Sequence, residues 1–508
     1  MLARIRTGTV RGVDAILVAV EVDVSSGLPQ TTTVGLPDGA VREGRDRIRA
    51  AVRNSGFTYP ARRVTVNLAP AGVRKEGAAF DLPIALALLA AAGDPPLPEL
   101  TSWCVLGELG LDGRIHTVRG ALPVAAAARS AGLGGMLVPE ANAEEAALAG
   151  GVSVFGVRTL TEAVAHLRGE QRLTPATADL DGLLGRGGTA AGDFAEVRGQ
   201  QHAKRALEIA AAGAHNVLLI GPPGAGKTML ARRLPSILPP LTRDEAIEVT
   251  AIHSVAGLLN GRPIVTERPV RSPHCTASDA AVLGGGHPVR PGEITLAHRG
   301  VLFLDELPEF HRHVLEPLRQ PLEECHITVA RGPGSLVFPA DFQLVGAMNP
   351  CPCGHLGDGT DQCRCSPPIL ERYRIRVSGP LLDRIDLHVH VPRLPVAQLA
   401  DDARPSEPSS AVRSRVLGAR EAQRARAAGT LNARLKGRDL RRHCRLDPKG
   451  QRLLETATER LGLSARAYTR ILRVARTIAD LAGEETLHSG HVAEAIQYRS
   501  LDRRATRD

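Results

Sequence analysis

Apolar and polar residues follow two different patterns over the first 168 residues of the chain. Apolar runs of strand length alternate with alanine-rich stretches whose apolar positions recur with a helical period. The runs that predict strands lie at residues 15–22, 63–68, 102–107, 135–138 and 152–156. The stretches that predict helices lie at residues 46–54, 82–92, 121–131 and 161–167. This alternation predicts an α+β or α/β domain.

Changes in composition divide the rest of the chain. Residues 169–192 contain a Gly-rich run and have linker composition. A Pro-, Ser- and Asp-containing stretch at 400–410 separates a nucleotide-binding α/β core from a helical C-terminal part. At 508 residues the chain is too long for one hydrophobic core. We therefore expect a multidomain α/β protein divided into residues 1–168, 169–192 (linker), 193–395 and 396–508.

A glycine-rich loop carries the strongest chemical signal in the chain. It follows a strand-like apolar run at 217–220 and precedes a helical pattern at 229–234. Its residues fit G-x-x-x-x-G-K-[ST] without a mismatch: Gly221, Pro222, Pro223, Gly224, Ala225, Gly226, Lys227 and Thr228. In this setting backbone N–H groups and a helix N-terminus face an anion. The motif predicts that the chain binds a nucleoside triphosphate, with Lys227 on the terminal phosphates and Thr228 on Mg²⁺.

Two acids follow an apolar run further along the chain. Residues 301–304 predict a buried strand, and Asp305 and Glu306 come directly after it. A carboxylate at this place can hold Mg²⁺, which is the role expected of Asp305, whereas Glu306 can orient and deprotonate the attacking water. A buried strand capped by solvated acids would look similar. The phosphate loop upstream favours a role of the two acids in triphosphate hydrolysis over this alternative.

Composition narrows the class of protein. Apolar content of 43% and charged content of 23% are typical of globular proteins. No secretory signal or membrane span is visible, and eight cysteines in such a chain favour a reducing compartment over a disulfide framework. We expect a cytoplasmic protein without membrane contact. Aromatic content of 3% argues against base stacking as the main contact with a nucleic acid.

Positive charge gathers in one part of the helical C-terminal region. Residues 413–445 hold 11 Lys and Arg against two acids, Glu421 and Asp439. This segment predicts either contact with phosphates or a solvated helix face.

Five motifs occur in the order typical of AAA+ ATPases, and the chain resembles the magnesium chelatase-like family over nearly its whole length. They lie at residues 193–200, 221–228, 304–306, 348–350 and 381–386. The resemblance implies a hexameric ring. It also implies that Asn349 is the first sensor, which positions the lytic water, and that Arg384 is an arginine finger supplied to a neighbouring subunit. Arg384 could instead form a salt bridge with Asp383 or Asp386.

The resemblance makes Arg466 the second sensor, at the start of a C-terminal helix. Arg470 and Arg473 lie on the same predicted helix and are alternatives for this role.

The N-terminal region resembles the proteolytic domain of Lon proteases, a ribosomal S5 domain 2-like α+β fold. The nucleophilic serine of that family aligns with Ala79 and its lysine with Leu122. Neither side chain can attack a carbonyl or accept a proton. We expect no peptidase activity, and a structural, oligomerising or DNA-guiding role for this domain.

Two insertions in the ATPase region predict further features. Residues 324–342 predict a β-hairpin, and in related helicase-type AAA+ proteins such a hairpin enters the ring channel, which makes Arg331 a candidate contact for DNA phosphates. The segment 271–292, with three consecutive glycines, could form a second channel loop.

Two C-x-C pairs separated by nine residues supply a cluster of thiols: Cys351, Cys353, Cys363 and Cys365. Four thiolates could bind a structural Zn²⁺ that takes no part in hydrolysis, with His355 as a substitute ligand. Reduced cysteines without a metal are the alternative.

Together these features predict a hexameric AAA+ motor that hydrolyses ATP and acts on single-stranded or branched DNA. The family resemblance implies helicase activity, namely branch migration during natural transformation (competence). One alternative is an ATPase that drives magnesium insertion into a tetrapyrrole. Another is a scaffold or chaperone-like remodeller whose N-terminal domain holds a protein partner.

Overall fold

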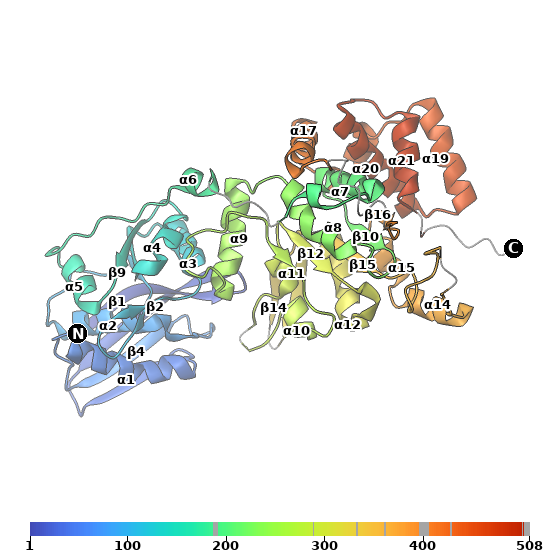
Figure 1. Cartoon of the computed structure of the whole chain (residues 1–508). Helices are drawn as coiled ribbons and strands as arrows, with labels where there is room; N and C mark the ends of the chain where they lie inside the picture. The colour runs from blue at the N-terminus through green and yellow to red at the C-terminus, as the bar shows by residue number, and fades with distance from the viewer. Residues whose placement is uncertain are drawn as a thin grey trace.

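The computed structural model of the chain describes residues 1–185, 192–287, 289–331, 334–359, 362–395, 406–426, 429–499 and 501. Figure 1 shows the N-terminal region at one end of the molecule, a sheet-containing ATPase region in the middle and a group of C-terminal helices at the other end. The overall prediction of a multidomain α/β protein with a helical C-terminal region is confirmed. No helix among the described residues has the length and apolarity needed to cross a bilayer.

A seven-stranded mixed sheet forms the N-terminal region, in the order β3-β4-β2-β1-β5-β8-β9. Its strands are β1 (Leu2–Arg11), β2 (Asp14–Ser25), β3 (Gln30–Val34), β4 (Arg63–Ala69), β5 (Trp103–Val105), β8 (Gly135–Pro139) and β9 (Ser153–Val157). Its helices are α1 (Gly39–Asn54), α2 (Asp81–Ala92), α3 (Ala121–Ser130), α4 (Glu140–Ala147) and α5 (Leu160–Leu167). Ten of the 12 residues of helix α2 are buried, because this helix has no polar face to turn toward solvent.

All five strands and four helices expected in this region are present, with shifted ends. Sequence analysis missed β1, β3 and α4. Strand β1 alternates as a half-buried strand should, but Arg4 and Arg6 interrupt its apolar character, and it forms a ten-residue antiparallel ladder with β2.

The ATPase region contains a five-stranded parallel sheet in the order β11-β12-β15-β10-β16. The strands are β11 (Val270–Arg271), β12 (Val301–Leu304), β15 (Gln343–Met348), β10 (Val217–Ile220) and β16 (Leu387–His390). Every residue of β10, β12 and β15 is buried, as expected for parallel strands covered on both faces. Because these strands are parallel, the residues that follow them lie along one edge, here called the carboxyl edge.

The C-terminal helices share a hydrophobic core with one face of this sheet. They are α17 (Ser409–Arg426), α18 (Gly437–His443), α19 (Pro448–Leu461), α20 (Ala465–Ala482) and α21 (Ser489–Gln497). Val416 of α17 and Ile471 of α20 belong to the same buried cluster as Val217 and Val345 of the sheet. The helical region is therefore joined to the ATPase sheet by a continuous core.

The N-terminal region also shares buried contacts with the ATPase region. Helix α9 (Arg243–Ala256) packs against α3, and Val249 lies in one apolar cluster with Val124. The backbone N–H of Gly120 donates to Ser254 Oγ at 3.0 Å, and Ser254 in turn bonds Glu145. Within the predicted linker, the structure has a short helix, α6 (Leu180–Gly185).

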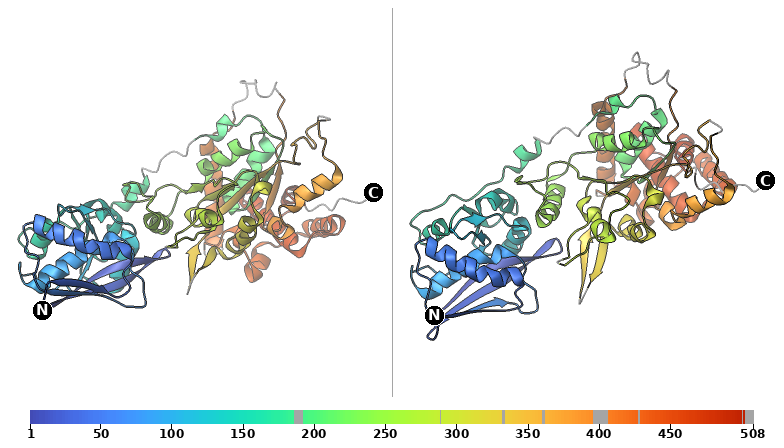
Figure 2. Two further views of the ribbon diagram at one scale, coloured as in Figure 1. Left: turned by 90° about the horizontal axis from the view of Figure 1, so that it is seen from below. Right: turned by 60° about the horizontal axis from the view of Figure 1, so that its bottom comes forward.

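The predicted hairpin is present as β13 (His326–Arg331) and β14 (Gly334–Pro339), paired antiparallel from His326↔Pro339 to Arg331↔Gly334. It projects from the ATPase region on the side of the N-terminal sheet (Figure 2). Val13, in the turn between β1 and β2, packs against the apolar cluster that includes Phe338 at the hairpin base.

Candidate active site

The phosphate loop connects β10 to α8 (Lys227–Arg233) at the carboxyl edge of the sheet. Gly221 passes so close to the neighbouring chain that a Cβ at this position would lie 2.1 Å from the carbonyl oxygen of Val391. Gly226 has φ +91°, a left-handed conformation that glycine adopts without strain, and it caps α8. Gln200, whose role the sequence did not reveal, donates from Nε2 to the carbonyl of Ala225 at 3.2 Å and so braces the loop.

Lys227 connects the phosphate loop to the end of β15. Its Nζ donates to the carbonyl oxygens of Gly221 and Pro222, at 2.6 and 2.9 Å, and to Asn349 Oδ1 at 3.1 Å. Burial lowers the pKa of Lys227, and the carboxylates of Asp305 and Glu306 oppose this shift. The structure therefore brings together the loop lysine and the candidate first sensor, which are 122 residues apart.

Thr228 and Asp305 form the second contact across the carboxyl edge. Thr228 Oγ1 donates to Asp305 Oδ2 at 2.8 Å, and the backbone N–H of Glu306 donates to Asp305 Oδ1 at 2.9 Å. A hydroxyl and a carboxylate at this separation fit Mg²⁺, which prefers one or two protein oxygens together with substrate phosphates. Glu306 is exposed and has φ +50°, a conformation that is strained for a residue other than glycine.

Asn349 has a further contact that the sequence did not indicate. The hydroxyl of Tyr373, on α14 (Pro367–Ile375), faces the backbone N–H of Asn349. Tyr373 is 6% exposed, and burial raises the pKa of its hydroxyl to about 12. The hydroxyl therefore stays neutral at physiological pH and can hold the backbone beside the candidate sensor.

Arg384 and Arg466 lie at the opposite, amino edge of the sheet. Arg384 precedes β16, and Arg466 begins α20, where it approaches Asp383 at 3.9 Å. A four-residue strand at about 3.3 Å per residue separates the two edges by roughly 13 Å. Neither arginine therefore joins Lys227 and Asp305 in the pocket of its own chain.

The ion pair considered for Arg384 involves a different acid from those expected. Its guanidinium contacts Glu323 at 2.7 Å and donates to the carbonyl of Pro380 at 2.6 Å, and the residue is 5% exposed. Asp383 and Asp386 instead face arginines of α20, namely Arg466 and Arg470. Glu323 lies 61 residues before Arg384 in the sequence, so no local pattern indicated this pairing.

The three arginines considered for the second sensor have different environments. Arg470 pairs with Asp386, which is 2% exposed, and Arg473 donates to the carbonyl of Leu435 at 2.9 Å. The Arg466 side chain is 59% exposed. Arg466 is therefore the member of this set with a guanidinium available to a neighbouring molecule.

The four clustered cysteines come together at the end of β15. The Sγ atoms of Cys351 and Cys353 are 3.3 Å apart, and Cys363 Sγ lies 3.9 and 3.7 Å from them. With Cys365, all four sulfurs lie within 4.8 Å of one another. His355 is engaged elsewhere, since its Nδ1 contacts Asp358 Oδ2 at 2.8 Å.

The position of Arg331 is described by its backbone alone. It is the last residue of β13, at the tip of the hairpin, and its side chain lies outside the described atoms. In the second candidate channel loop, Arg271 and Glu293 form an ion pair, and Gly285 pairs with Arg290.

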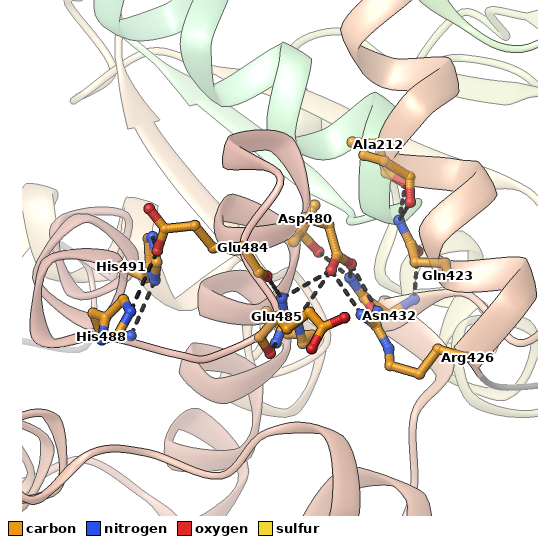
Figure 3. A network of polar contacts seen from close by, with 12 residues as sticks. Ala212, Gln423, Arg426, Asn432, Asp480, Glu484, Glu485, His488 and His491 are labelled. Carbon is orange, nitrogen blue, oxygen red and sulfur yellow. Dashed lines mark hydrogen bonds and ion pairs between the residues drawn. The ribbon is translucent and has the colours of Figure 1, made fainter.

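The basic segment 413–445 is partly used inside the fold, which neither of its two interpretations anticipated. Arg426 contacts both oxygens of Asp480 at 2.7 Å, and Asn432 joins the same carboxylate (Figure 3). Arg434 likewise pairs with Asp341 at 2.7 Å. The exposed positive charges of the segment lie on α17 and on and beside α18: Arg415, Arg424, Lys436, Arg438, Arg441, Arg442 and Arg445.

The cleft beside Ala79, the residue aligned with the Lon nucleophile, lies between the N-terminal and ATPase regions. A cavity of about 1040 Å³ lies elsewhere, among the C-terminal helices, whereas the cavity beside Ala79 measures about 500 Å³ and is also lined by Val289 and Arg290. Leu122 is 2% exposed and belongs to the apolar core. Ala79 thus lines the cleft, but the residue aligned with the lysine is buried beside it.

Three features lie on one edge of a parallel sheet: a phosphate loop after β10, paired acids after β12 and an asparagine after β15. Together they define a P-loop nucleoside triphosphatase. Three family models match the chain: "Magnesium chelatase, subunit ChlI" over residues 193–399, "Subunit ChlI of Mg-chelatase" over 20–142 and "Magnesium chelatase, subunit ChlI C-terminal" over 406–499.

Relatives match over nearly the full length. Competence protein ComM of Haemophilus influenzae is 47% identical over 493 residues, covering 97% of this chain and 96% of the relative. The uncharacterized protein YifB of Salmonella typhimurium is 45% identical over 503 residues, covering 99% and 98%. The magnesium-chelatase 38 kDa subunit of Rhodobacter capsulatus is 27% identical over 201 residues, covering 36% and 55%. The chain belongs to the magnesium chelatase-like AAA+ ATPase family of ComM and YifB.

Proposed function

We propose that the chain is a hexameric ATP-driven motor that moves along DNA and drives branch migration when foreign DNA is recombined during natural transformation. The observation that carries the proposal is the pair of contacts Thr228–Asp305 and Lys227–Asn349, which assemble a hydrolytic pocket on one edge of the sheet. The motor acts in the cytoplasm, where clustered thiols stay reduced.

The residues of the carboxyl edge have separate tasks in hydrolysis. Backbone N–H groups of the phosphate loop and the Lys227 ammonium bind the terminal phosphates, for which the ammonium must leave the loop carbonyls that it contacts. Thr228 and Asp305 would hold Mg²⁺, and this ion would supply positive charge that offsets the charge on the phosphates. Glu306 accepts a proton from the attacking water, and Asn349 orients that water.

The position of the two arginines supports a ring. Arg384 and Arg466 lie on the amino edge, roughly 13 Å from the pocket of their own chain. In a closed ring with head-to-tail contacts, the amino edge of one subunit can face the carboxyl edge of the next. Arg384 then acts as the arginine finger of the neighbouring pocket, after leaving Glu323, and Arg466 acts as the second sensor.

DNA is the proposed substrate for three reasons. The relative from Haemophilus influenzae is named a competence protein. The β13–β14 hairpin projects from the ATPase region and ends at Arg331, which we assign to contact DNA phosphates. Relatives named for magnesium chelatase align with 36% and 45% of this chain, whereas the competence protein aligns with 97%, and this difference favours DNA over a tetrapyrrole as the substrate.

A second metal is included in the proposal. The four-cysteine cluster binds one structural Zn²⁺, which takes no part in the reaction.

The test is ATP turnover by the purified chain with and without single-stranded and four-way-junction DNA. We expect stimulation by DNA that weakens steeply as salt rises. We also expect ATP-dependent branch migration of a synthetic junction that Glu306→Gln abolishes. Turnover that DNA leaves unchanged and that a protein partner stimulates would contradict the DNA motor and favour a protein remodeller.

A further inference from the structure

The four cysteines surround a space that suits a single ion. A tetrahedral zinc–thiolate site with bonds of about 2.3 Å has sulfur–sulfur separations of about 3.8 Å. The separations among Cys351, Cys353 and Cys363 are 3.3, 3.7 and 3.9 Å, and Cys365 lies within 4.8 Å of all three. A disulfide would require about 2.05 Å, and all four cysteines are free.

The loop that carries these cysteines touches the phosphate loop. Gly354 has φ +85°, and a Cβ on it would lie 2.5 Å from Cδ and 2.8 Å from Cγ of Pro223. Pro223 is the third residue of the phosphate loop. The cysteine loop therefore packs directly on the segment whose backbone is to bind phosphate, with no space between them for a side chain.

The same cysteines are also tied to the candidate first sensor from both sides. Cys351 is fully buried and comes two residues after Asn349. Cys365 comes just before α14, whose Tyr373 hydroxyl faces the backbone N–H of Asn349. An ion bound by all four thiols would thus fix the two chain segments that hold Asn349.

We infer that the loop that carries the four cysteines is a positioning device for ATP hydrolysis: an ion held by their thiols keeps Gly354 packed on Pro223 and fixes Asn349, so turnover depends on a metal that touches neither nucleotide nor water. This inference rests on the proposed ATPase function and on the proposed zinc ion. Two routes lead from the ion to the pocket. Gly354 acts on the phosphate loop, and Tyr373 acts on Asn349.

The first experiment measures metal in the purified full-length chain by elemental analysis, for zinc and iron together. We expect about one zinc per chain, lost when Cys353 and Cys363 are both changed to Ser and retained in Cys275→Ser, a cysteine outside the cluster. Absence of stoichiometric metal overturns the inference. Iron in place of zinc overturns the identity of the ion. This measurement is independent of ATP turnover, so it stands even if the chain hydrolyses no ATP.

The second experiment separates the two routes with matched variants that keep every cysteine. Gly354→Ala adds a methyl group against Pro223, and we expect kcat/KM for ATP to fall about ten- to a hundredfold, chiefly through KM. Gly357→Ala is the control because Gly357 also has positive φ, +76°, but its Cβ would meet nothing within 4 Å. Equal effects of the two substitutions would show general loop strain and overturn the phosphate-loop route.

Tyr373→Phe tests the other route. It removes the hydroxyl that faces the Asn349 N–H without changing the ring, and we expect kcat to fall on the order of tenfold with KM for ATP unchanged. Zinc content should stay at the wild-type level in Gly354→Ala and Tyr373→Phe. Removal of zinc by a chelator should lower turnover in the same way as these variants, with recovery when zinc is restored. Undiminished turnover in the zinc-free chain, with its circular dichroism spectrum preserved, would overturn the coupling.

Discussion

The two edges of the ATPase sheet differ in what their polar residues contact. At the carboxyl edge, Lys227, Thr228 and Asp305 bond groups of the same pocket, including Asn349. At the amino edge, Arg384 and Arg470 are held by acids of their own chain, Glu323 and Asp386. One edge thus has its groups in place for nucleotide, whereas the other has cations that a single chain keeps occupied. In the proposed ring, one subunit would therefore supply parts of two different sites.

Removal of the Arg384 guanidinium tests whether the amino edge completes a neighbouring pocket. We expect Arg384→Ala to lower turnover about 10³- to 10⁵-fold while nucleotide binding is retained, because the finger stabilises charge only as the phosphate is transferred. Mixing it with Lys227→Ala subunits should restore part of the turnover.

The control for this substitution is Glu323→Gln, which removes the acid but keeps the arginine, and its turnover should persist. If mixed subunits regain no turnover, the two edges do not form a shared site.

Glu306→Gln tests the carboxyl edge alone. The amide cannot accept a proton from water, so we expect turnover to fall about 10²- to 10⁴-fold with ATP still bound. Glu309→Gln, three residues later, changes an exposed acid that pairs with Arg376 and serves as the matched control. Similar losses in both variants, measured by single-turnover hydrolysis, would remove the catalytic role from Glu306.

Two arginines of α20 should differ in how much they stabilise the fold, because one forms a buried ion pair and the other is exposed. Arg470→Ala leaves the buried Asp386 carboxylate without its ion pair, and we expect a loss of about 3–5 kcal/mol in the free energy of unfolding. Arg466→Ala removes an exposed guanidinium 3.9 Å from Asp383, so the loss should be below about 1 kcal/mol. Denaturant titration measures both. A larger loss in stability for Arg466→Ala would make Arg466 structural.

A pH dependence of stability should arise from the strand that borders the amino edge. His388 of β16 is buried, and burial, with the charges of Arg499 and Arg470, lowers its pKa well below 6.5, although Asp386 opposes the shift. Below pH 6.5 the unfolded chain therefore binds a proton that the folded chain does not. Stability is fully present above pH 6.5 and falls by about 1.4 kcal/mol between pH 7.5 and 5.5 from this group.

His388→Leu should reduce the slope of stability against pH by this amount. Other histidines with lowered pKa values, His253 among them, leave a residual slope. An unchanged slope would show that His388 is protonated in the folded chain.

Contacts between residues close in sequence were predictable from the pattern of residues. The phosphate loop and its flanking strand and helix follow one another directly in the sequence, so the local sequence motif indicates their geometry. Asp305 and Glu306 were likewise expected directly after a buried strand, and they follow β12. These features follow from hydrophobic period and backbone sterics, which act over a few residues.

Contacts between distant segments were not predictable in this way. Three contacts join separate elements: Arg384 pairs with Glu323, the Tyr373 hydroxyl faces the backbone N–H of Asn349, and Gly354 packs on Pro223. Each depends on how helices and loops pack around the sheet, and a charged or aromatic residue has several chemically equal partners in the sequence. The same holds for the basic segment 413–445, in which Arg426 pairs with Asp480 and Arg434 with Asp341. Only the packing of the folded chain selects these two acids among the many in the sequence.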